Sequence, residues 1–278
     1  MNDPDGIAAE LGRIAVEAGR LLAAVGDRRA GHQLKDDGSP STDADVAAER
    51  LILSRLAALW PDIPVVAEES GSPAGRGERF FLVDPLDGTR DYLTGGSEYS
   101  VNIALVEADR PVAAALAAPG QDRVWVAGTG VRVARFEDLE RGARGGRPLS
   151  REGGRWLPVA VRSAPSNGVV ALASRRHGDA ETDACLAKLR VGEVRTSSSA
   201  VKFGLIASAE ADVYVRCGPT MEWDTAAGDH IVTVAGGRVF GPDGRPLTYG
   251  HNERGYLNGP FAAVGDPSLA PEITLPVR

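Results

Sequence analysis

The sequence is poor in cysteine, and this narrows the classes of protein to which it can belong. Only Cys185 and Cys217 occur among its 278 residues, and they do not form a Cys-X-X-Cys pair. Because zinc ribbons and dithiol redox motifs need closely spaced thiols, neither is expected. We expect both cysteines to be buried free thiols in a protein of a reducing compartment.

Basic segments and long apolar segments are also missing. The net charge is −7 and no run is rich in lysine and arginine, which argues against binding of nucleic acid polymers. The longest apolar runs, such as residues 112–118, are too short to span a bilayer, and the acidic first residues contain no apolar segment typical of a signal peptide. We therefore expect a cytoplasmic protein with at most peripheral membrane association, and either a monomer or a homodimer.

The remaining composition is that of an ordinary globular enzyme, with 43% hydrophobic and 25% charged residues. In the first half of the chain, apolar residues at helical spacing predict a helix over residues 7–25, and capping side chains predict a second helix from residues 41–43. Two helices followed by a run of strands indicate an α+β arrangement. The strands are expected at residues 63–67, 80–83, 101–106, 111–118 and 124–127.

The second half alternates between short strands and helices, which is typical of an α/β layer. Strands are predicted at residues 169–173, 194–196, 213–215 and 237–240, and helices at residues 179–189, 200–208 and 224–235. We therefore divide the chain into an N-terminal α+β half, residues 1–157, and a C-terminal α/β half, residues 158–278. The Gly- and Arg-rich stretch 137–156 is interpreted as a loop or variable hairpin near that boundary.

The most informative segment is residues 84–89, Asp-Pro-Leu-Asp-Gly-Thr, which follows the predicted strand 80–83 directly. Asp-Pro and Asp-Gly commonly mark plain turns. Two closely spaced carboxylates at a strand end, however, supply the oxygen ligands that Mg²⁺ prefers. Gly88 lets the backbone approach an anion, and N–H groups beside it can bind a phosphate. By itself, the segment indicates metal-dependent phosphate chemistry.

Four further patches agree with this interpretation, although each also has a simpler explanation. Glu68 and Glu69 follow a predicted strand and can be a solvated acidic pair. Asp224 can be a helix cap, and Asp45, in a patch that begins at Lys35, can stabilise the first turn of a helix without any chemical role. The fourth patch, residues 174–177, ends in a histidine that alone would indicate only a surface side chain.

Together these segments resemble the inositol monophosphatase superfamily of magnesium-dependent, lithium-sensitive phosphatases. Residues 68–70 (Glu-Glu-Ser), 84–89 and 223–228 (Trp-Asp-Thr-Ala-Ala-Gly) have the order and spacing of that family. Finer motifs resemble the CysQ-type 3′(2′),5′-bisphosphate nucleotidases of sulfur metabolism, which hydrolyse 3′-phosphoadenosine 5′-phosphate to AMP and phosphate. The finer motifs are residues 39–45, 101–105, 174–177, 199–203 and 214–220. The fold that the resemblance implies is a layered αβαβα sandwich of the inositol monophosphatase/fructose-1,6-bisphosphatase type.

The resemblance also implies roles for individual residues at the reacting phosphate. The ligands implied for two to three Mg²⁺ ions are Glu68, Asp84, Asp87 and Asp224, with the backbone carbonyl of Leu86. The residues implied for catalysis are Glu68, Asp45 and Thr89, of which the last two would accept a proton beside the attacking water. The residues implied for binding the phosphate are Gly88, Thr89 and Lys35. Glu69 would support these ligands or hold a weakly bound additional metal.

Substrate recognition is implied mainly for the second half of the chain, which also supplies Asp224. The residues concerned are Arg90, Ser174, His177, Ser199, Lys202 and Arg216. Lys202 and Arg216 would take the phosphate that is not transferred, because basic side chains, and the arginine fork above all, match phosphate oxygens. The run before Lys202 is Ser-Ala-Val from residue 199, where these enzymes commonly have Gly-Ser-Ser, so the pocket is expected to differ in detail.

Other functions remain open from the sequence alone. The nearest is a monophosphatase for inositol, histidinol or a sugar phosphate, which would not need a second cationic site around Lys202 and Arg216. A phosphate-binding protein that has lost catalysis would keep the fold, although every expected ligand is present here. A purely structural α/β domain would predict no effect of replacing Asp87.

Overall fold

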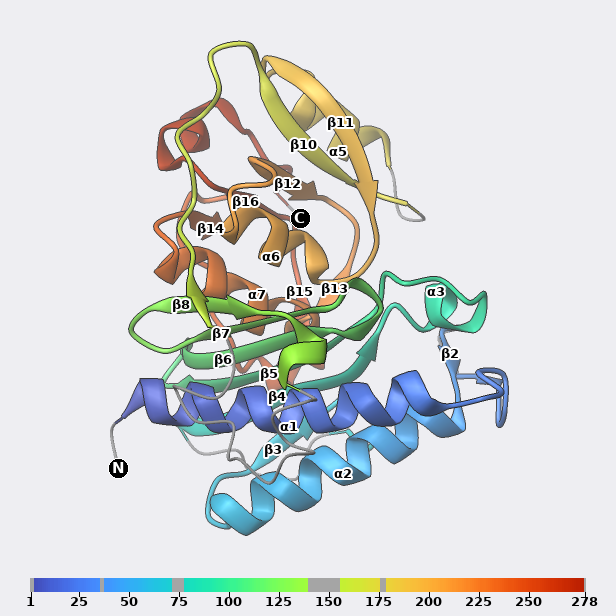
Figure 1. Ribbon diagram of the computed structural model, residues 1–278. Helices are drawn as coiled ribbons and strands as arrows, with labels where there is room; N and C mark the ends of the chain where they lie inside the picture. The colour runs from blue at the N-terminus through green and yellow to red at the C-terminus, as the bar shows by residue number, and fades with distance from the viewer. Residues whose placement is uncertain (1–2, 36–37, 72–77, 140–155, 176–178, 278) are drawn as a thin grey trace.

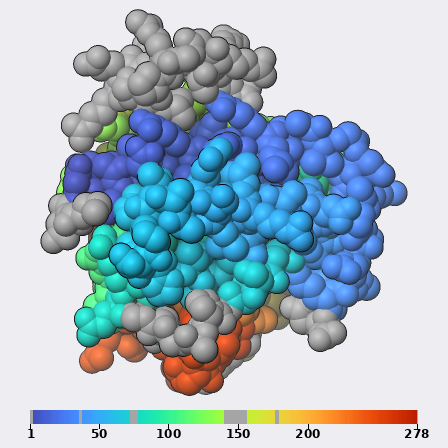
Figure 2. Space-filling view, turned by 90° about the horizontal axis from the view of Figure 1, so that it is seen from below, coloured from blue at the N-terminus to red at the C-terminus, as the bar shows by residue number. Residues whose placement is uncertain are grey.

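The computed structural model describes residues 3–35, 38–71, 78–139, 156–175 and 179–277 (Figure 1). Two β-sheets alternate with helices in five layers. The first layer consists of helices α1 (Pro4–Ala24) and α2 (Asp43–Leu59), which cover the outer face of a seven-stranded sheet. Seen from below, these two helices (blue) form most of that face of the molecule (Figure 2).

The strands of the seven-stranded sheet lie side by side in the order of the sequence. They are β3 (Val65–Ala67), β4 (Arg79–Asp87), β5 (Ser100–Glu107), β6 (Arg110–Ala118), β7 (Arg123–Ala127), β8 (Val131–Ala134) and β9 (Leu157–Pro158). β3 and β4 are parallel, and every later pair of neighbours is antiparallel. The short helix α3 (Thr89–Leu93) connects β4 to β5.

The second sheet has five strands in the order β11, β10, β12, β16, β14. Their bounds are β10 (Val169–Ser174), β11 (Val191–Ser197), β12 (Val213–Arg216), β14 (Arg238–Phe240) and β16 (Phe261–Val264). β10 is parallel to β11 and β12, whereas β16 is antiparallel to β12 and β14. Helix α5 (Ala180–Leu186) and the 3₁₀ segment η3 (Pro267–Glu272) pack on the outer face of this sheet.

Helices α6 (Val201–Ala207) and α7 (Glu222–Val234) lie between the two sheets (Figure 1). Strand β4 shows how one sheet serves two cores, because its side chains alternate between faces. Phe80 and Leu82 pack with the α6–α7 layer, while Phe81 and Val83 pack under α1 and α2, and all four are almost fully buried. The predicted αβαβα sandwich is thereby confirmed.

Smaller elements shape the rims of the molecule. Two short β-ribbons pair β1 (Gln33–Leu34) with β2 (Pro40–Ser41), and β13 (Thr220–Met221) with β15 (Leu257–Asn258). The 3₁₀ segments η1 (Pro119–Gln121) and η2 (Asn252–Arg254) lie in turns. None of the helices in the described ranges combines the length and hydrophobicity needed to cross a membrane.

Several sequence-based expectations can be compared with these elements. The helices expected at residues 7–25 and from residues 41–43 are α1 and α2, and both cysteines are buried free thiols, as predicted. Strand β16 was not predicted; it pairs antiparallel with β12 and β14, so the C-terminal sheet is mixed. Residues 140–155 of the Gly- and Arg-rich stretch lie outside the described residues. The division after residue 157 remains a prediction; β9 spans it.

Candidate active site

The acidic segment is part of strand β4, which corrects the expectation that the strand ends at residue 83. Asp84 pairs with Asn102 and Asp87 with Ser100, so β4 carries one residue more than β5 over this interval. This is a β-bulge, and bulges re-aim side chains next to active sites. Within it, the backbone N–H of Leu86 donates to Asp84 Oδ1 at 3.0 Å.

Gly88 ends this strand in a conformation that suits only glycine. Its φ is 94°, in the left-handed region, and it forms the N-cap of α3. A Cβ atom at this position would stand 2.8 Å from the carbonyl oxygen of Glu98 and 3.4 Å from the Cβ atom of Ser199. The glycine therefore allows the acidic segment to approach the loop before β5 and the turn before α6.

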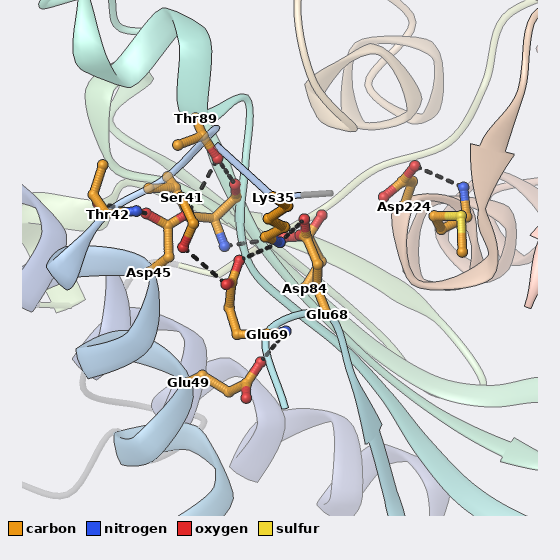
Figure 3. A network of polar contacts seen from close by, with 12 residues as sticks. Lys35, Ser41, Thr42, Asp45, Glu49, Glu68, Glu69, Asp84, Thr89 and Asp224 are labelled. Atoms are coloured by element: carbon orange, nitrogen blue, oxygen red, sulfur yellow. Dashed lines mark hydrogen bonds and ion pairs between the residues drawn. The ribbon is translucent and has the colours of Figure 1, made fainter. Parts of the chain in front are cut away.

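Four carboxylates line one cleft of about 660 Å³. Asp84 and Asp87 come from the bulge, Glu68 follows β3, and Asp224 stands in the first turn of α7. Figure 3 shows Asp84 and Glu68 close together, with Asp224 facing them from α7. The structure thus brings together, from distant parts of the sequence, the four side chains predicted as metal ligands.

Burial and mutual repulsion make these acids hard to ionise. The pKa of Asp84 is raised well above its usual value, mainly by burial and next by the negative charges of Glu68, Asp87 and Asp224. The pKa of Asp224 is raised to about 8, mainly by burial and next by the negative charges of Asp87 and Glu68. The pKa values of Glu68 and Asp87 are also raised, chiefly by burial, although Lys35 and Lys202 respectively oppose the shift. Such a cluster favours a cation that neutralises it.

The oxygen donors of the cleft are of the kind that a hard cation binds. Their side chains, however, are not arranged as a complete metal site. Among the described residues, no three Asp, Glu, His or Cys side chains form a ready-made ligand group. One of the four acids, Glu68, is engaged in an ion pair instead, because Lys35 Nζ lies 2.8 Å from its Oε1. The carboxylates of Glu68, Asp84, Asp87 and Asp224 and the carbonyl of Leu86 offer only oxygen donors, as Mg²⁺ and similar cations require.

Lys35 lies beside the cleft and is not among the lining residues, but its ion pair with Glu68 connects it to the acidic cluster (Figure 3). Its ammonium group also pairs with Glu69 Oε1 at 2.6 Å, and Glu69 Oε2 accepts the hydroxyl of Ser41 at 2.9 Å. Glu49 Oε2 accepts the backbone N–H of Glu69 at 2.8 Å. Glu69 thereby holds Lys35 beside Glu68, while the role of Lys35 in phosphate binding stays a prediction.

Asp45 and Thr89 are in contact across the N-termini of α2 and α3 (Figure 3). Thr89 Oγ1 lies 3.1 Å from Asp45 Oδ1 and 3.0 Å from the carbonyl oxygen of Leu86. Asp45 Oδ2 accepts the hydroxyl and the backbone N–H of Thr42, which forms a capping box at α2. Burial is the main reason that the pKa of Asp45 is raised. The expected contact is present, and its role in proton transfer stays a prediction.

Asp224 is fixed by the start of α7. It is the third residue of the helix, and its Oδ2 accepts the backbone N–H of Met221 at 2.9 Å. The neighbouring Glu222, which is fully buried, was not predicted from the sequence. Glu222 Oε1 accepts the backbone N–H of His251 at 2.9 Å and contacts its Nδ1 at 2.6 Å, which ties the loop before η2 to the start of α7. Only the fold shows this contact, because the partners are far apart in sequence.

Most of the residues predicted to recognise the substrate line the same cleft. These are Arg90, Ser174, Ser199, Lys202 and Arg216. Lys202 is almost fully buried: its Nζ donates to the carbonyl oxygens of Ser199 at 2.7 Å and Ser197 at 3.3 Å. Arg216 Nη2 donates to the carbonyl oxygen of Pro219 at 2.8 Å, and Arg90 Nη2 lies 3.4 Å from that of Gly38. His177 lies outside the described residues.

Two further residues that line the cleft beside these basic side chains were not singled out from the sequence. The ring of Tyr214 lies under Lys202, with Nζ 4.9 Å from the ring centroid, and aromatic faces stabilise such cations. Arg175 also lines the cleft and forms an ion pair with Glu98. Arg175 falls within the motif at residues 174–177, but nothing in the sequence distinguishes it from a surface arginine.

Comparisons with known proteins agree with this geometry. The pattern of the Inositol monophosphatase family matches residues 5–272. The chain is 36% identical over 232 residues to the 3′(2′),5′-bisphosphate nucleotidase CysQ of Escherichia coli (strain K12), covering 82% of this chain and 86% of that protein. The solved structure of CysQ from Bacteroides thetaiotaomicron, at 29% identity, superposes with a TM-score of 0.68 over 94% of this chain and 97% of its own.

A more distant structure extends the likeness in fold alone. The IMPase of Thermotoga maritima is 20% identical and superposes with a TM-score of 0.73, covering 94% of each chain. Sequence pattern, curated relative and solved structures thus agree over nearly the whole length. The chain belongs to the inositol monophosphatase family.

Proposed function

We propose that this phosphatase removes the 3′-phosphate of 3′-phosphoadenosine 5′-phosphate, and of its sulfated precursor, to give AMP or its sulfated form and phosphate, with Mg²⁺ as cofactor. The observation that carries the proposal is the composition of one cleft: four carboxylates and the basic side chains Lys202 and Arg216 line it together. A monophosphate needs only the acidic part. A second phosphate on the same substrate gives Lys202 and Arg216 a partner, and the names of the CysQ relatives support this reading.

The residues that would hold the cation are Glu68, Asp84, Asp87 and Asp224, with the carbonyl of Leu86. When bound, Mg²⁺ would neutralise phosphate charge and make water a better nucleophile. The Thr89 hydroxyl, between Asp45 Oδ1 and the carbonyl oxygen of Leu86, can take a proton from the attacking water as it passes its own to Asp45. The raised pKa of Asp45 makes its carboxylate a stronger base for this transfer.

The first turn of α3 would orient the phosphate that is cut. The first N–H groups of a helix have no acceptor within it, and they attract anions. In α3 these groups belong to residues that follow Gly88 directly, at the edge of the cleft. The bulge thus places the carboxylates and the start of α3 within a few residues of each other.

The function is tested by a phosphate-release screen with purified protein and Mg²⁺. The substrates are 3′-phosphoadenosine 5′-phosphate, its sulfated precursor, inositol 1-phosphate, histidinol phosphate and fructose 1,6-bisphosphate. We expect the highest kcat/KM for the two adenosine bisphosphates. A higher kcat/KM for inositol 1-phosphate would show a monophosphatase, and tight binding of substrate without phosphate release would show a protein that has lost catalysis.

Replacing Thr89 by valine tests the proton path. Valine keeps the shape of the side chain and removes the hydroxyl between Asp45 and Leu86, so kcat is expected to fall about 10²- to 10⁴-fold, the usual contribution of a positioned acid–base group. Thr89→Ser retains the hydroxyl and should recover most of the loss. The measurement is kcat in the phosphate-release assay. Equal loss in the valine and serine variants would mean that packing, and not the hydroxyl, matters at this position.

The raised pKa values predict how pH changes the stabilisation by magnesium. Asp224 titrates at about 8 in the folded chain, far above its usual 3.8. Between these pH values the folded chain keeps a proton that the unfolded chain has lost, so the free energy of unfolding falls as pH rises towards 8. Mg²⁺ binds the ionised carboxylates and competes with that proton. By calorimetry, we expect Mg²⁺ to raise Tm more at pH 8 than at pH 6.

The control for this experiment is Asp84→Asn, which removes one of the four charges. Its gain in Tm on adding Mg²⁺ should be small at both pH values, because the site has lost a ligand and much of the repulsion that a cation relieves. An equal gain at pH 6 and pH 8 in the unsubstituted protein would contradict the link between the carboxylates and cation binding.

A further inference from the structure

Arg175 is a basic residue of the cleft to which the proposed chemistry assigns no task. It follows the last residue of β10 and lines the cleft together with Ser174, Lys202 and Arg216. Its side chain is 48% exposed, and Nη2 donates to Glu98 Oε2. A guanidinium group has five N–H donors in a planar fork, so this contact leaves donors for a second anion.

Glu98 holds Arg175 from the other half of the molecule. It belongs to the loop between α3 and β5, and its side chain is only 15% exposed. Its backbone N–H donates to Asp91 Oδ2 at 3.1 Å, which fixes the loop against α3. The loop position is further constrained by Gly88, whose missing Cβ would meet the carbonyl oxygen of Glu98. The carboxylate of Glu98 is therefore a fixed acceptor.

The same carboxylate also holds the turn that leads into α6. Glu98 Oε2 accepts the backbone N–H of Ser198 at 3.2 Å. Two more contacts tie this turn to the first sheet: the hydroxyl groups of Ser199 and Ser100 are 3.0 Å apart, and the backbone N–H of Ala200 donates to Asp87 Oδ2.

Lys202 closes this turn from the other side by donating to its carbonyl oxygens, as described above. The basic side chains Arg175, Lys202 and Arg216 line one side of the cleft, here called the cationic wall. Glu98 contacts the first of them directly and supports the second through the turn. The carboxylate of Glu98 therefore helps to position both Arg175, which follows β10, and Lys202, which belongs to α6.

We propose that Arg175 is a further specificity residue, which binds the second phosphate of the substrate together with Lys202 and Arg216, and that Glu98 is a positioning residue that orients Arg175 for this contact. The inference rests on the proposed function, because only a bisphosphate has a second phosphate to bind. An arginine that bridges a fixed carboxylate and a phosphate keeps one orientation of its fork, whereas a free arginine must lose rotamer entropy on binding.

The first experiment compares Arg175→Gln with the unsubstituted protein. We expect KM for 3′-phosphoadenosine 5′-phosphate to rise about tenfold or more, as for loss of a charged hydrogen bond, with kcat nearly unchanged. KM for inositol 1-phosphate should not change. By calorimetry, AMP should bind more weakly by a similar factor, because it carries the 5′-phosphate alone, while adenosine should bind equally. Arg175→Lys should recover only part of the loss.

The matched control is Arg55→Gln. Arg55 forms a surface ion pair with Glu17, with contacts of 2.9 and 2.6 Å, and its side chain is 54% exposed. It lies on α2, away from the residues that line the cleft. The substitution removes the same charge, so any change due to net charge alone would occur in both variants. We expect no change in KM for the control.

The second experiment tests Glu98 through a double-mutant cycle. Glu98→Gln keeps an oxygen that can accept the N–H of Ser198 but removes the charge that pairs with Arg175. It should raise KM for the bisphosphate several-fold by itself and have little further effect in the Arg175→Gln background. Fully additive effects would show that Glu98 does not act through Arg175 and would overturn its assigned role.

The remaining outcomes separate this inference from the function on which it rests. If the unsubstituted protein prefers inositol 1-phosphate, both the proposed function and the second-phosphate site are wrong. If it prefers the bisphosphate but Arg175→Gln changes KM for both substrates equally, or for neither, the function stands and the role of Arg175 is wrong.

Discussion

Replacing Asp87 by asparagine is expected to reduce kcat for phosphate release by at least about 10³-fold, the upper range for loss of one preorganised electrostatic group. Asp87 is one of four acids in the cleft, and asparagine removes its charge with almost no change in volume. The amide oxygen can still accept the backbone N–H of Ala200, so the turn before α6 keeps its contact. A large loss of activity would therefore arise in the site and not from loss of the fold.

The same variant makes an unusual prediction for stability. Burial raises the pKa of Asp87, so its ionised form destabilises the folded chain at neutral pH. Without Mg²⁺ at pH 8, Asp87→Asn is therefore expected to melt at a higher temperature than the unsubstituted protein. The control is Asp243→Asn, which removes an exposed charge whose side chain is 62% accessible. Activity near that of the unsubstituted protein would contradict the assignment of Asp87 as a metal ligand.

Replacing Lys202 by methionine is expected to raise KM for 3′-phosphoadenosine 5′-phosphate by about a hundredfold, as for loss of a desolvated charged contact. KM for inositol 1-phosphate should change far less. Burial lowers the pKa of Lys202 to about 8, so the unliganded side chain loses its charge as pH rises through that value. In the unsubstituted protein, KM for the bisphosphate should therefore increase above pH 8, and the methionine variant should lack this increase.

Two further variants separate the loss of phosphate binding from a disturbance of the turn before α6. Because Lys202 also donates to the carbonyl oxygens of Ser197 and Ser199, its loss can disturb the turn. Arg216→Ala leaves the turn intact and should also raise KM selectively for the bisphosphate. Lys188→Met removes an exposed lysine next to α5 and should change neither KM. Equal effects on both substrates in the Lys202 and Arg216 variants would show that neither side chain binds the second phosphate.

The parts of the site that the sequence predicted well are those set by local chemistry. Thr42 and Asp45 form the cap of α2 because a hydroxyl and a carboxylate three residues apart satisfy free backbone N–H groups at a helix start. Gly88 has a positive φ because the chain turns sharply there. Such features depend on a few neighbouring residues, so a single sequence contains the information.

The features that the sequence did not reveal depend on distant partners. Pro85 suggested the end of a strand, but the bulge accommodates it within β4, because the extra residue there lies outside the regular pairing with β5. Strand β16 is only four residues long, and in the sequence it resembles any short apolar run. Only its pairing with β12 and β14 in the folded chain identifies it as a strand. By pattern Lys202 would be a surface charge, yet in the folded chain it is a buried residue of α6 whose ammonium group faces the ring of Tyr214.

The close approach at Gly88 also limits how this protein can change in evolution or by design. Any larger residue there would press on the carbonyl oxygen of Glu98, and therefore on the loop that positions the cationic wall. The side chains of Arg90 and Arg175, by contrast, are exposed at the open side of the cleft, so other residues can be accommodated at these two positions. We therefore expect new substrate preferences to be reached through such side chains, while the backbone around Gly88 tolerates almost no substitution.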